Sequence, residues 1–134
     1  STGFFRAKAR SIQAAARTLV QEFPSGVPSG MQELLRLPGV GRKTANVLRA
    51  TCFGLPGIIV DTHVRRVSRR LGLATSDDPD RIEEELCALL PEQSWTAFSH
   101  ALTFHGRRVC AARRPDHGSC VVRRLCPEGK ETTR

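Results

Sequence analysis

Residues 37–46 read Leu-Pro-Gly-Val-Gly-Arg-Lys-Thr-Ala-Asn, and this stretch decides the fold of the chain. Apolar residues at helical spacing flank it, so it predicts two helices joined by a Gly-Val-Gly hairpin. Because glycine has no Cβ, the hairpin backbone can approach another chain closely with its amides pointing outward. At the start of the second helix these N–H groups join the positive end of the helix dipole. The pattern predicts a phosphate-binding turn that reads no base sequence, the alternative being an ordinary turn between helices.

The charge of the chain favours a polyanionic partner, with nucleic acid ahead of a membrane. The 134 residues carry 21 Lys and Arg against 13 Asp and Glu, a formal charge of +8. Residues 1–30 hold four basic residues and one acidic, residues 31–106 hold nine of each, and residues 107–134 hold eight basic and three acidic. The cationic ends are therefore the expected partner-binding segments. Only 5% of the residues are aromatic, which argues against a stacking platform for single strands and favours a basic helical binder.

The chain shows no sequence feature of a membrane or secreted protein. No apolar run approaches the ~18 to 20 residues that span a bilayer, and no leader with a cleavage site opens the sequence. We expect a soluble protein in a reducing compartment. In such a compartment, clustered thiols are more often metal ligands than disulfides.

The apolar periodicity predicts an all-α chain. Helices are expected over 5–23, 31–37, 40–53, 62–71, 79–90 and 94–109, with a ligand-binding coil over 110–126. Asp61 and Thr62 are good N-caps for the fourth helix, and Pro79 suits the first turn of the fifth. Cys52 and Cys87 are expected as buried apolar positions, and His100 and His105 as core histidines.

Four motifs together resemble the endonuclease III branch of the helix-hairpin-helix DNA glycosylases. They are residues 37–46, Val-Asp-Thr-His at 60–63, His-Gly-Arg at 105–107 and the cysteine-rich tail, and the match runs from about Gly3 to Cys126. The resemblance implies two lobes. Residues 1–59 would be the remainder of a six-helix lobe that includes the helix-hairpin-helix at about 31–53, and residues 60–134 a second helical lobe ending in the cluster loop 110–126. Members of the family carry further residues before Ser1, so the chain is expected to lack their N-terminal part.

The family chemistry centres on Lys43 and Asp61. The resemblance implies that Lys43 attacks the anomeric carbon of a flipped-out nucleotide, expels the base and forms a Schiff base, which loses the 3′ phosphate by β-elimination. Asp61, eighteen residues later, would stabilise the cationic sugar and help move protons, besides capping its helix. The implied function is base-excision repair of oxidised pyrimidines with abasic-site lyase activity, in the bacterial cytoplasm near the nucleoid. The alternatives are a non-catalytic DNA-binding fragment and a monofunctional mismatch glycosylase, and Lys43 argues against the second.

The expected partner is double-stranded DNA with a damaged base or an abasic site, bound by a monomer with no membrane contact. The residues expected to contact it are Gly39, Val40, Gly41, Arg42, Thr44, His63, Arg113, Arg114 and Phe4. Phe4 aligns with the family residue that fills the gap left by the extruded nucleotide. An aromatic anchor for the first helix is the other reading of Phe4.

The tail holds Cys110, His117, Cys120 and Cys126, with six, two and five residues between them. Related glycosylases have four cysteines at this spacing around a [4Fe-4S] cluster, so His117 replaces a cysteine. Three thiolates and one imidazole could hold such a cluster or a tetrahedral zinc ion, and the third possibility is no metal. A metal here would fix the coil that carries Arg113 and Arg114.

Overall fold

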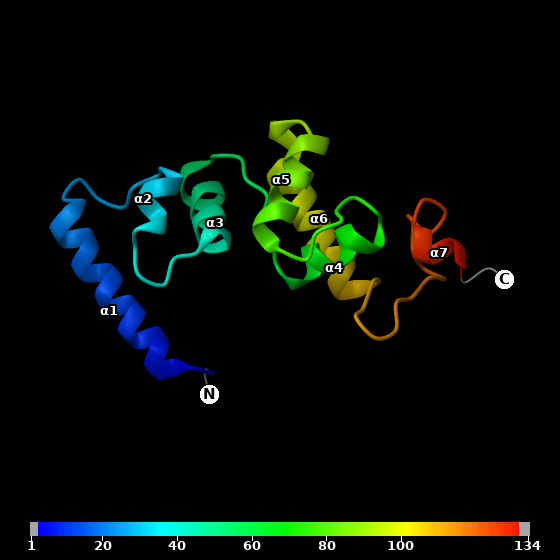
Figure 1. Cartoon of the computed structure of the whole chain (residues 1–134), viewed down its shortest axis with the longest axis horizontal. Coiled ribbons are helices and arrows are strands. Elements are labelled where there is room, and N and C mark those ends of the chain that lie inside the picture. The colour runs from blue at the N-terminus through cyan, green and yellow to red at the C-terminus, as the bar shows by residue number, and fades with distance from the viewer. Residues whose placement is uncertain (1–2, 132–134) are drawn as a thin grey trace. The chain divides into compact units, whose positions relative to one another are not determined.

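The computed structural model describes residues 3–131, and the chain divides into two compact units, Ser1–Leu55 and Pro56–Arg134 (Figure 1). Over residues 3–131 every regular element is a helix, which confirms the all-α prediction. None of the helices in this range is long and apolar enough to cross a membrane. The predicted lobe boundary at residues 59 and 60 stays a prediction about the complete family fold.

The first unit is built on the predicted hairpin. It contains α1 (Phe5–Glu22), α2 (Met31–Leu35) and α3 (Arg42–Phe53). Leu34, Leu37 and Ala45 form its core, and Val40 packs against them from the hairpin, half-buried. The Val40 amide donates to the Leu37 carbonyl at 3.0 Å within the turn, so α3 begins at Arg42 and not at Val40 as predicted.

The second unit carries the remaining elements. They are α4 (Thr62–Arg70), α5 (Pro79–Leu89), the 3-10 turn η1 (Glu92–Ser94), α6 (Trp95–Arg108) and α7 (Pro127–Glu131). Its core is apolar and contains Ile58, Val64, Val67, Ile82 and Leu86, all fully buried. The two helices α4 and α6 pack directly against each other.

Gly106 explains how closely α4 and α6 approach. A Cβ at this position would lie 2.9 Å from Cβ of His63 and 3.1 Å from Cγ2 of Val67, both on α4. Only glycine, without a side chain, fits at this crossing. The contact places the start of α4 beside the last turns of α6.

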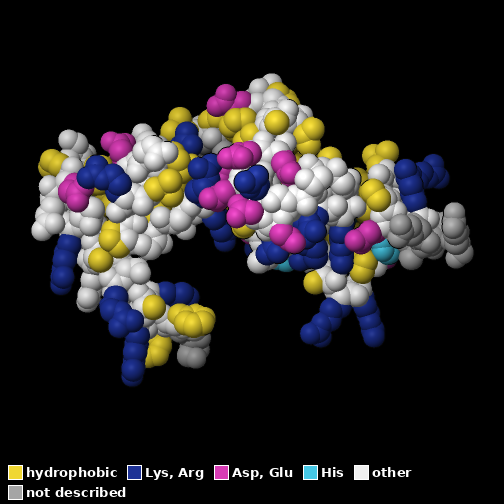
Figure 2. Space-filling model, viewed as in Figure 1, with side chains coloured by type: hydrophobic (Ala, Val, Ile, Leu, Met, Phe, Trp, Pro, Cys, Tyr) yellow, Lys and Arg dark blue, Asp and Glu magenta, His cyan; other side chains and the backbone are white. Residues whose placement is uncertain are grey.

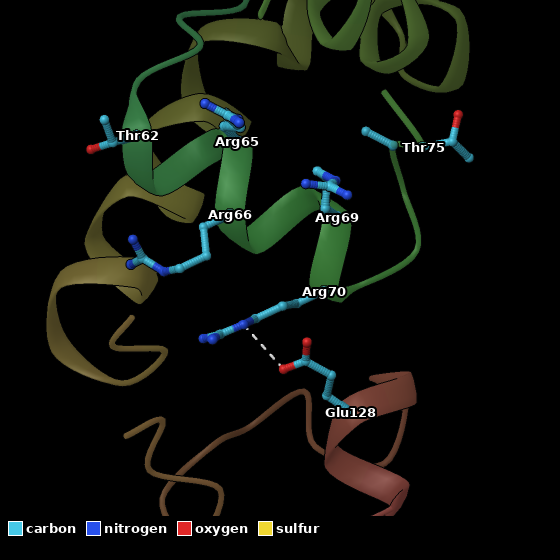
Figure 3. Close-up of a pocket in the computed structure, with 8 residues that line it drawn as sticks. Thr62, Arg65, Arg66, Arg69, Arg70, Thr75 and Glu128 are labelled. Atoms are coloured by element: carbon cyan, nitrogen blue, oxygen red, sulfur yellow. Dashed lines mark ion pairs between the residues drawn. The ribbon is translucent and has the colours of Figure 1, made fainter. Parts of the chain in front are cut away.

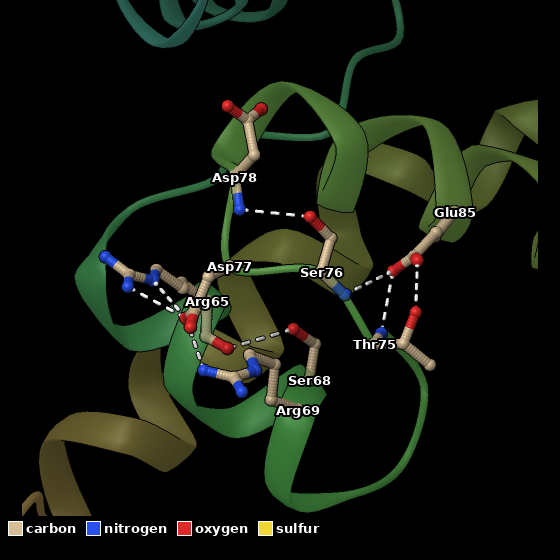
Figure 4. A network of polar contacts seen from close by, with 8 residues as sticks. All are labelled: Arg65, Ser68, Arg69, Thr75, Ser76, Asp77, Asp78 and Glu85. Carbon is tan, nitrogen blue, oxygen red and sulfur yellow. Dashed lines mark hydrogen bonds and ion pairs between the residues drawn. The ribbon is translucent and has the colours of Figure 1, made fainter.

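Asp77, which follows α4 in the chain, accepts hydrogen bonds from two arginines of that helix (Figure 4). Arg65 and Arg69 both donate to Oδ1 of Asp77, Arg65 through Nη2 at 2.8 Å. The Arg65 hydrogen bond, helped by the charge of Arg69, lowers the pKa of Asp77. Hydrogen bonds from the Thr75 hydroxyl and amide likewise lower the pKa of Glu85. Figure 2 shows the acidic side chains of this unit next to basic ones, so the local charges largely cancel.

The expectation that Cys52 is buried was wrong. Cys52 lies on α3 with its side chain exposed, whereas Cys87 on α5 packs partly buried against the second core. Both positions have apolar neighbours in sequence, but only Cys87 points to the inner face of its helix. The sequence pattern also did not predict α7.

Candidate functional site

The two hairpin glycines have different structural roles. Gly39 has a φ of +82°, which side chains rarely adopt, and a Cβ there would lie 2.7 Å from Cβ of Ser11 on α1. The fold therefore requires glycine at 39. Gly41 has an ordinary φ of −96°, and a Cβ there would meet nothing within 4 Å. Since packing within the chain does not require Gly41, the space beside it is free for a ligand.

The first turn of α3 presents backbone donors next to this space. Gly41 is the N-cap and has no side chain to accept a hydrogen bond from the turn. The first amides of a helix have no acceptor within the helix, and they lie at the positive end of its dipole. Lys43 and Thr44 lie in this turn with exposed side chains, and Arg42 is half-buried. An anion at Gly41 would therefore find amides and a lysine at the same helix start.

Asp61 is held in place by the helix it starts. Its Oδ1 accepts hydrogen bonds from the amides of His63 and Val64, both at 2.8 Å, which confirms the predicted N-cap. Its Oδ2 accepts a hydrogen bond from the hydroxyl of Thr103 on α6 at 3.3 Å. The carboxylate is partly exposed. One oxygen thus supports the helix, and the other lies toward α6. Lys43 belongs to the first unit and Asp61 to the second.

Two arginines on α4 bind the beginning of the predicted ligand loop. Arg66 donates to the carbonyls of Gly106 and Cys110, each at 2.9 Å through Nη2, and the same nitrogen lies 3.1 Å from Nδ1 of His63. Arg70 donates to the carbonyls of Ala111 and Ala112 at 2.8 and 2.9 Å.

Arg66 and Arg70 line a pocket of ≈ 560 Å³ together with Arg65, Arg69 and Glu128. Figure 3 shows these side chains. Arg70 also pairs with Glu128 on α7 at 3.1 Å. Helix α4 therefore connects Asp61 at its start to the beginning of the coil 110–126 and to α7, which follows the coil.

The four predicted metal ligands line one small cavity in the second unit. Cys110, His117, Cys120 and Cys126 all contribute to its wall, together with His105. Arg70 Nη1 lies 3.3 Å from Sγ of Cys110, and His105 Nε2 lies 3.7 Å from Sγ of Cys120. However, among residues 3–131 no three Cys, His, Asp or Glu side chains are grouped closely enough to hold a metal ion. The structure thus brings these residues to one cavity without forming a metal centre.

The other predicted DNA contacts are exposed or partly exposed. Arg113 and Arg114 are exposed on the coil that follows α6, and His63 is half-buried beside Arg66. Phe4 precedes α1 in a left-handed conformation (φ 57°) and its side chain is 87% exposed. This exposure argues against Phe4 as an anchor of α1 to a core within the described chain. Its role as a wedge in DNA stays a prediction.

The sequence also matches a described family of repair proteins. Residues 1–92 match the HhH-GPD superfamily base excision DNA repair proteins, which is more than half of the chain and contains the hairpin, Lys43 and Asp61. The chain belongs to the HhH-GPD superfamily. The predicted resemblance to the endonuclease III branch is also confirmed by the individual relatives of this HhH-GPD chain.

Endonuclease III of Synechocystis is 55% identical over 131 residues, covering 97% of this HhH-GPD chain and 60% of the relative. Endonuclease III of Escherichia coli is 41% identical over 124 residues, covering 92% of the chain and 59% of the relative. A solved structure of a trapped Endonuclease III–DNA covalent intermediate superposes with a TM-score of 0.92 at 44% identity, covering 98% of this chain and 62% of that one. The chain therefore spans about 60% of the length of these relatives.

Several residues that shape the site of this HhH-GPD chain were missed in the sequence. The sequence pattern does not indicate Arg66, Arg70 or Thr103. Of the two predicted core histidines, His105 borders the cavity beside Cys120 and His100 is exposed on α6. A glycine inside the α6 pattern, Gly106, was the one sequence signal of a close helix contact at this place. Their contacts join segments 15 to 44 residues apart, so they cannot be predicted from helical periodicity.

Proposed function

We propose that this chain binds duplex DNA and acts as a DNA glycosylase with abasic-site lyase activity. The observation that carries the proposal is the 44% identical relative whose structure holds a covalent intermediate with DNA, because this chain has an exposed lysine in the first turn after its hairpin. Oxidised pyrimidines in double-stranded DNA are the proposed substrates. The open space beside Gly41 and the amides of the α3 start support a phosphate contact there.

The proposed reaction uses Lys43 as the nucleophile. Its neutral Nζ forms a bond to the anomeric carbon while the bond to the damaged base breaks, and the base leaves with the electron pair. The sugar ring opens to a protonated imine with Nζ. Loss of a proton from the neighbouring sugar carbon then expels the 3′ phosphate, which cuts the strand. The Asp61 carboxylate is proposed to stabilise the positive charge on the sugar, with its position fixed by the helix cap.

Borohydride trapping tests this proposal. The chain is incubated with a duplex that contains one abasic site, and reduction is expected to fix a covalent complex through Lys43. Lys43→Gln is expected to abolish trapping and to keep most of the affinity for the duplex, because the amides of the hairpin remain. Binding without trapping by the wild-type chain would identify a DNA-binding module without lyase chemistry. Trapping that persists in Lys43→Gln would assign the nucleophile to another amine.

We propose further that Cys110, His117, Cys120 and Cys126 bind a [4Fe-4S] cluster, with zinc as the competing occupant. Support comes from the donor set, since three thiols and an imidazole line one cavity. The side chains would have to close in on the cavity to reach ligand distances. When bound, the group would fix the coil with Arg113 and Arg114.

Iron, sulfide and zinc analysis of the purified chain, together with its absorption spectrum, tests this occupant. His117→Cys restores four thiols and is expected to retain more iron. Colourless protein with one equivalent of zinc would contradict the proposed cluster. Protein without any metal would contradict both the cluster and the zinc site.

A further inference from the structure

A row of three hydroxyls on α6 faces the non-helical segment that leads into Asp61. The hydroxyls belong to Thr96, Ser99 and Thr103, which are spaced by three and four residues and so share one face of the helix. The segment 57–61 precedes α4 and contains no helix. Both elements lie within the second unit.

Each hydroxyl contacts one residue of the segment, and the three contacted residues are two positions apart. The Thr96 Oγ1 lies 3.4 Å from both the amide nitrogen and the carbonyl oxygen of Gly57. Ser99 Oγ accepts a hydrogen bond from the amide of Ile59 at 2.9 Å and donates to the Trp95 carbonyl, also at 2.9 Å. Thr103 Oγ1 donates to Oδ2 of Asp61 at 3.3 Å. The polar contacts thus fall on residues 57, 59 and 61.

The side chains between these positions are in the core. Ile58 is fully buried and Val60 is 8% exposed, and both pack in the apolar cluster of the second unit. Ile59, between them, is also buried at 9% exposure, and the Asp61 amide donates to the Ile59 carbonyl at 3.2 Å in a tight turn. Core packing of Ile58 and Val60 and the hydroxyl bonds to residues 57, 59 and 61 together fix how the segment lies against α6. A shift by one residue would place Ile58 and Val60 at the hydroxyls and leave the Ile59 amide without its acceptor.

We propose that Thr96, Ser99 and Thr103 are positioning residues that set the register of segment 57–61 and direct the Asp61 carboxylate for the reaction. The last bond of the row reaches the carboxylate itself. Oδ1 of Asp61 is engaged by two amides of α4, so the Thr103 bond to Oδ2 fixes the remaining rotation of the group. The positioning of Asp61 for catalysis rests on the proposed function, whereas its orientation by Thr103 does not.

The matched pair Thr103→Val and Thr103→Ser separates the hydroxyl from the packing. Valine keeps the shape and removes the donor, whereas serine keeps the donor. For Thr103→Val we expect kcat for strand cleavage to fall about tenfold or more with KM for the duplex unchanged, because a hydrogen bond to a charged group is lost. Thr103→Ser is expected to stay within about threefold of wild type, because it keeps that bond. Equal losses in the two variants, or no loss in Thr103→Val, would overturn a positioning role.

Crystal structures of wild type and Thr103→Val give a readout that needs no activity. The Asp61 carboxylate is expected to rotate in the variant, while its bonds to the amides of His63 and Val64 remain. An unchanged Asp61 would overturn the inference. If the wild-type chain traps no DNA, the proposed function fails, and the orientation of Asp61 still decides the inference.

Ser99→Ala tests the register at the middle of the row. Ser99 is 1% exposed, so its loss leaves the Ile59 amide buried without an acceptor. We expect Tm to fall by roughly 4 °C or more, whereas Thr103→Val shifts it less. Unchanged Tm in Ser99→Ala would contradict a role of this hydroxyl in holding the segment.

Discussion

Gly39 and Ser11 are in such close contact that a Cβ on Gly39 would lie 2.7 Å from Cβ of Ser11. The contact joins the hairpin to α1, and the φ of +82° at Gly39 adds a second reason for glycine. Two residues later, Gly41 has neither constraint. The motif Gly-Val-Gly therefore combines one glycine that the fold requires and one whose surroundings are left open.

Alanine at each glycine is expected to separate these roles. Gly39→Ala should destabilise the chain by about 2 kcal/mol or more, since a positive φ and a clash both oppose a side chain. Gly41→Ala should cost at most about 1 kcal/mol, the difference between glycine and alanine at an N-cap. The added methyl should instead weaken duplex binding and lower the salt slope of log K by about one phosphate contact. Urea unfolding and binding titrations at several salt concentrations measure both, and equal stability losses would contradict the distinction.

Two substitutions of Asp61 distinguish its contribution to stability from its contribution to activity. Asn is as good an N-cap as Asp, so Asp61→Asn should keep the stability of wild type, whereas Asp61→Ala should lose about 1 kcal/mol with the cap. Both variants remove the charge, and both should lower the rate of strand cleavage by roughly 10²-fold. Thermal unfolding and single-turnover cleavage provide the two measurements. An active Asp61→Asn would show that the carboxylate serves only as a cap.

Most of the local structure could be predicted from the sequence, because caps, prolines and glycines act on the backbone within a few residues. The cap at Asp61, Pro79 in the first turn of α5 and the glycines of the hairpin all act within about one helical turn, and all were predicted. The exposed thiol of Cys52 shows the limit of this reasoning, since helical periodicity does not say which face of a helix meets the core.

The residues around the candidate site were less predictable, because tertiary packing brings them together. His105 reaches Cys120 across 15 residues, and Thr103 reaches Asp61 across 42. The hydroxyls at 96, 99 and 103 share one helix face by their spacing, but their partners lie on a segment with no periodicity of its own. To predict such site geometry, one must know which helices pack together.

The two ion pairs that Asp77 forms with Arg65 and Arg69 predict a pH dependence of stability. Because the pKa of Asp77 is lowered in the folded state, its contribution is complete above the unfolded pKa of about 3.9 and is lost as the pH falls through the lower folded value. Asp77→Asn should thus be less stable than wild type at pH 7, and the difference should close below about pH 4.

The salt dependence of stability provides a second test of these two ion pairs. The side chains of Asp77 and Arg65 are 60% and 48% exposed, so added salt should also reduce the difference in unfolding free energy between wild type and Asp77→Asn. Glu84→Gln, at an exposed position of α5, is the control for loss of one negative charge. The same pH and salt profile in both variants would assign the effect to net charge.

The hydrogen bonds of Arg66 connect α4 to the end of α6, and their contribution to the free energy of unfolding can be measured. The Arg66 guanidinium binds the carbonyl of Gly106, one of the last acceptors of α6, and that of Cys110, at the start of the coil that follows the helix. Arg66→Gln should lower the free energy of unfolding by about 1 to 3 kcal/mol, since partly buried acceptors lose a charged donor. Arg107→Gln removes the same charge from an exposed position of α6 and should change stability by less than about 0.5 kcal/mol. Urea unfolding of the two variants compares them directly. Equal effects would show that Arg66 acts through its charge, and the larger effect of Arg66→Gln would show that the connection between the Asp61 helix and the cysteine-rich coil depends on these hydrogen bonds.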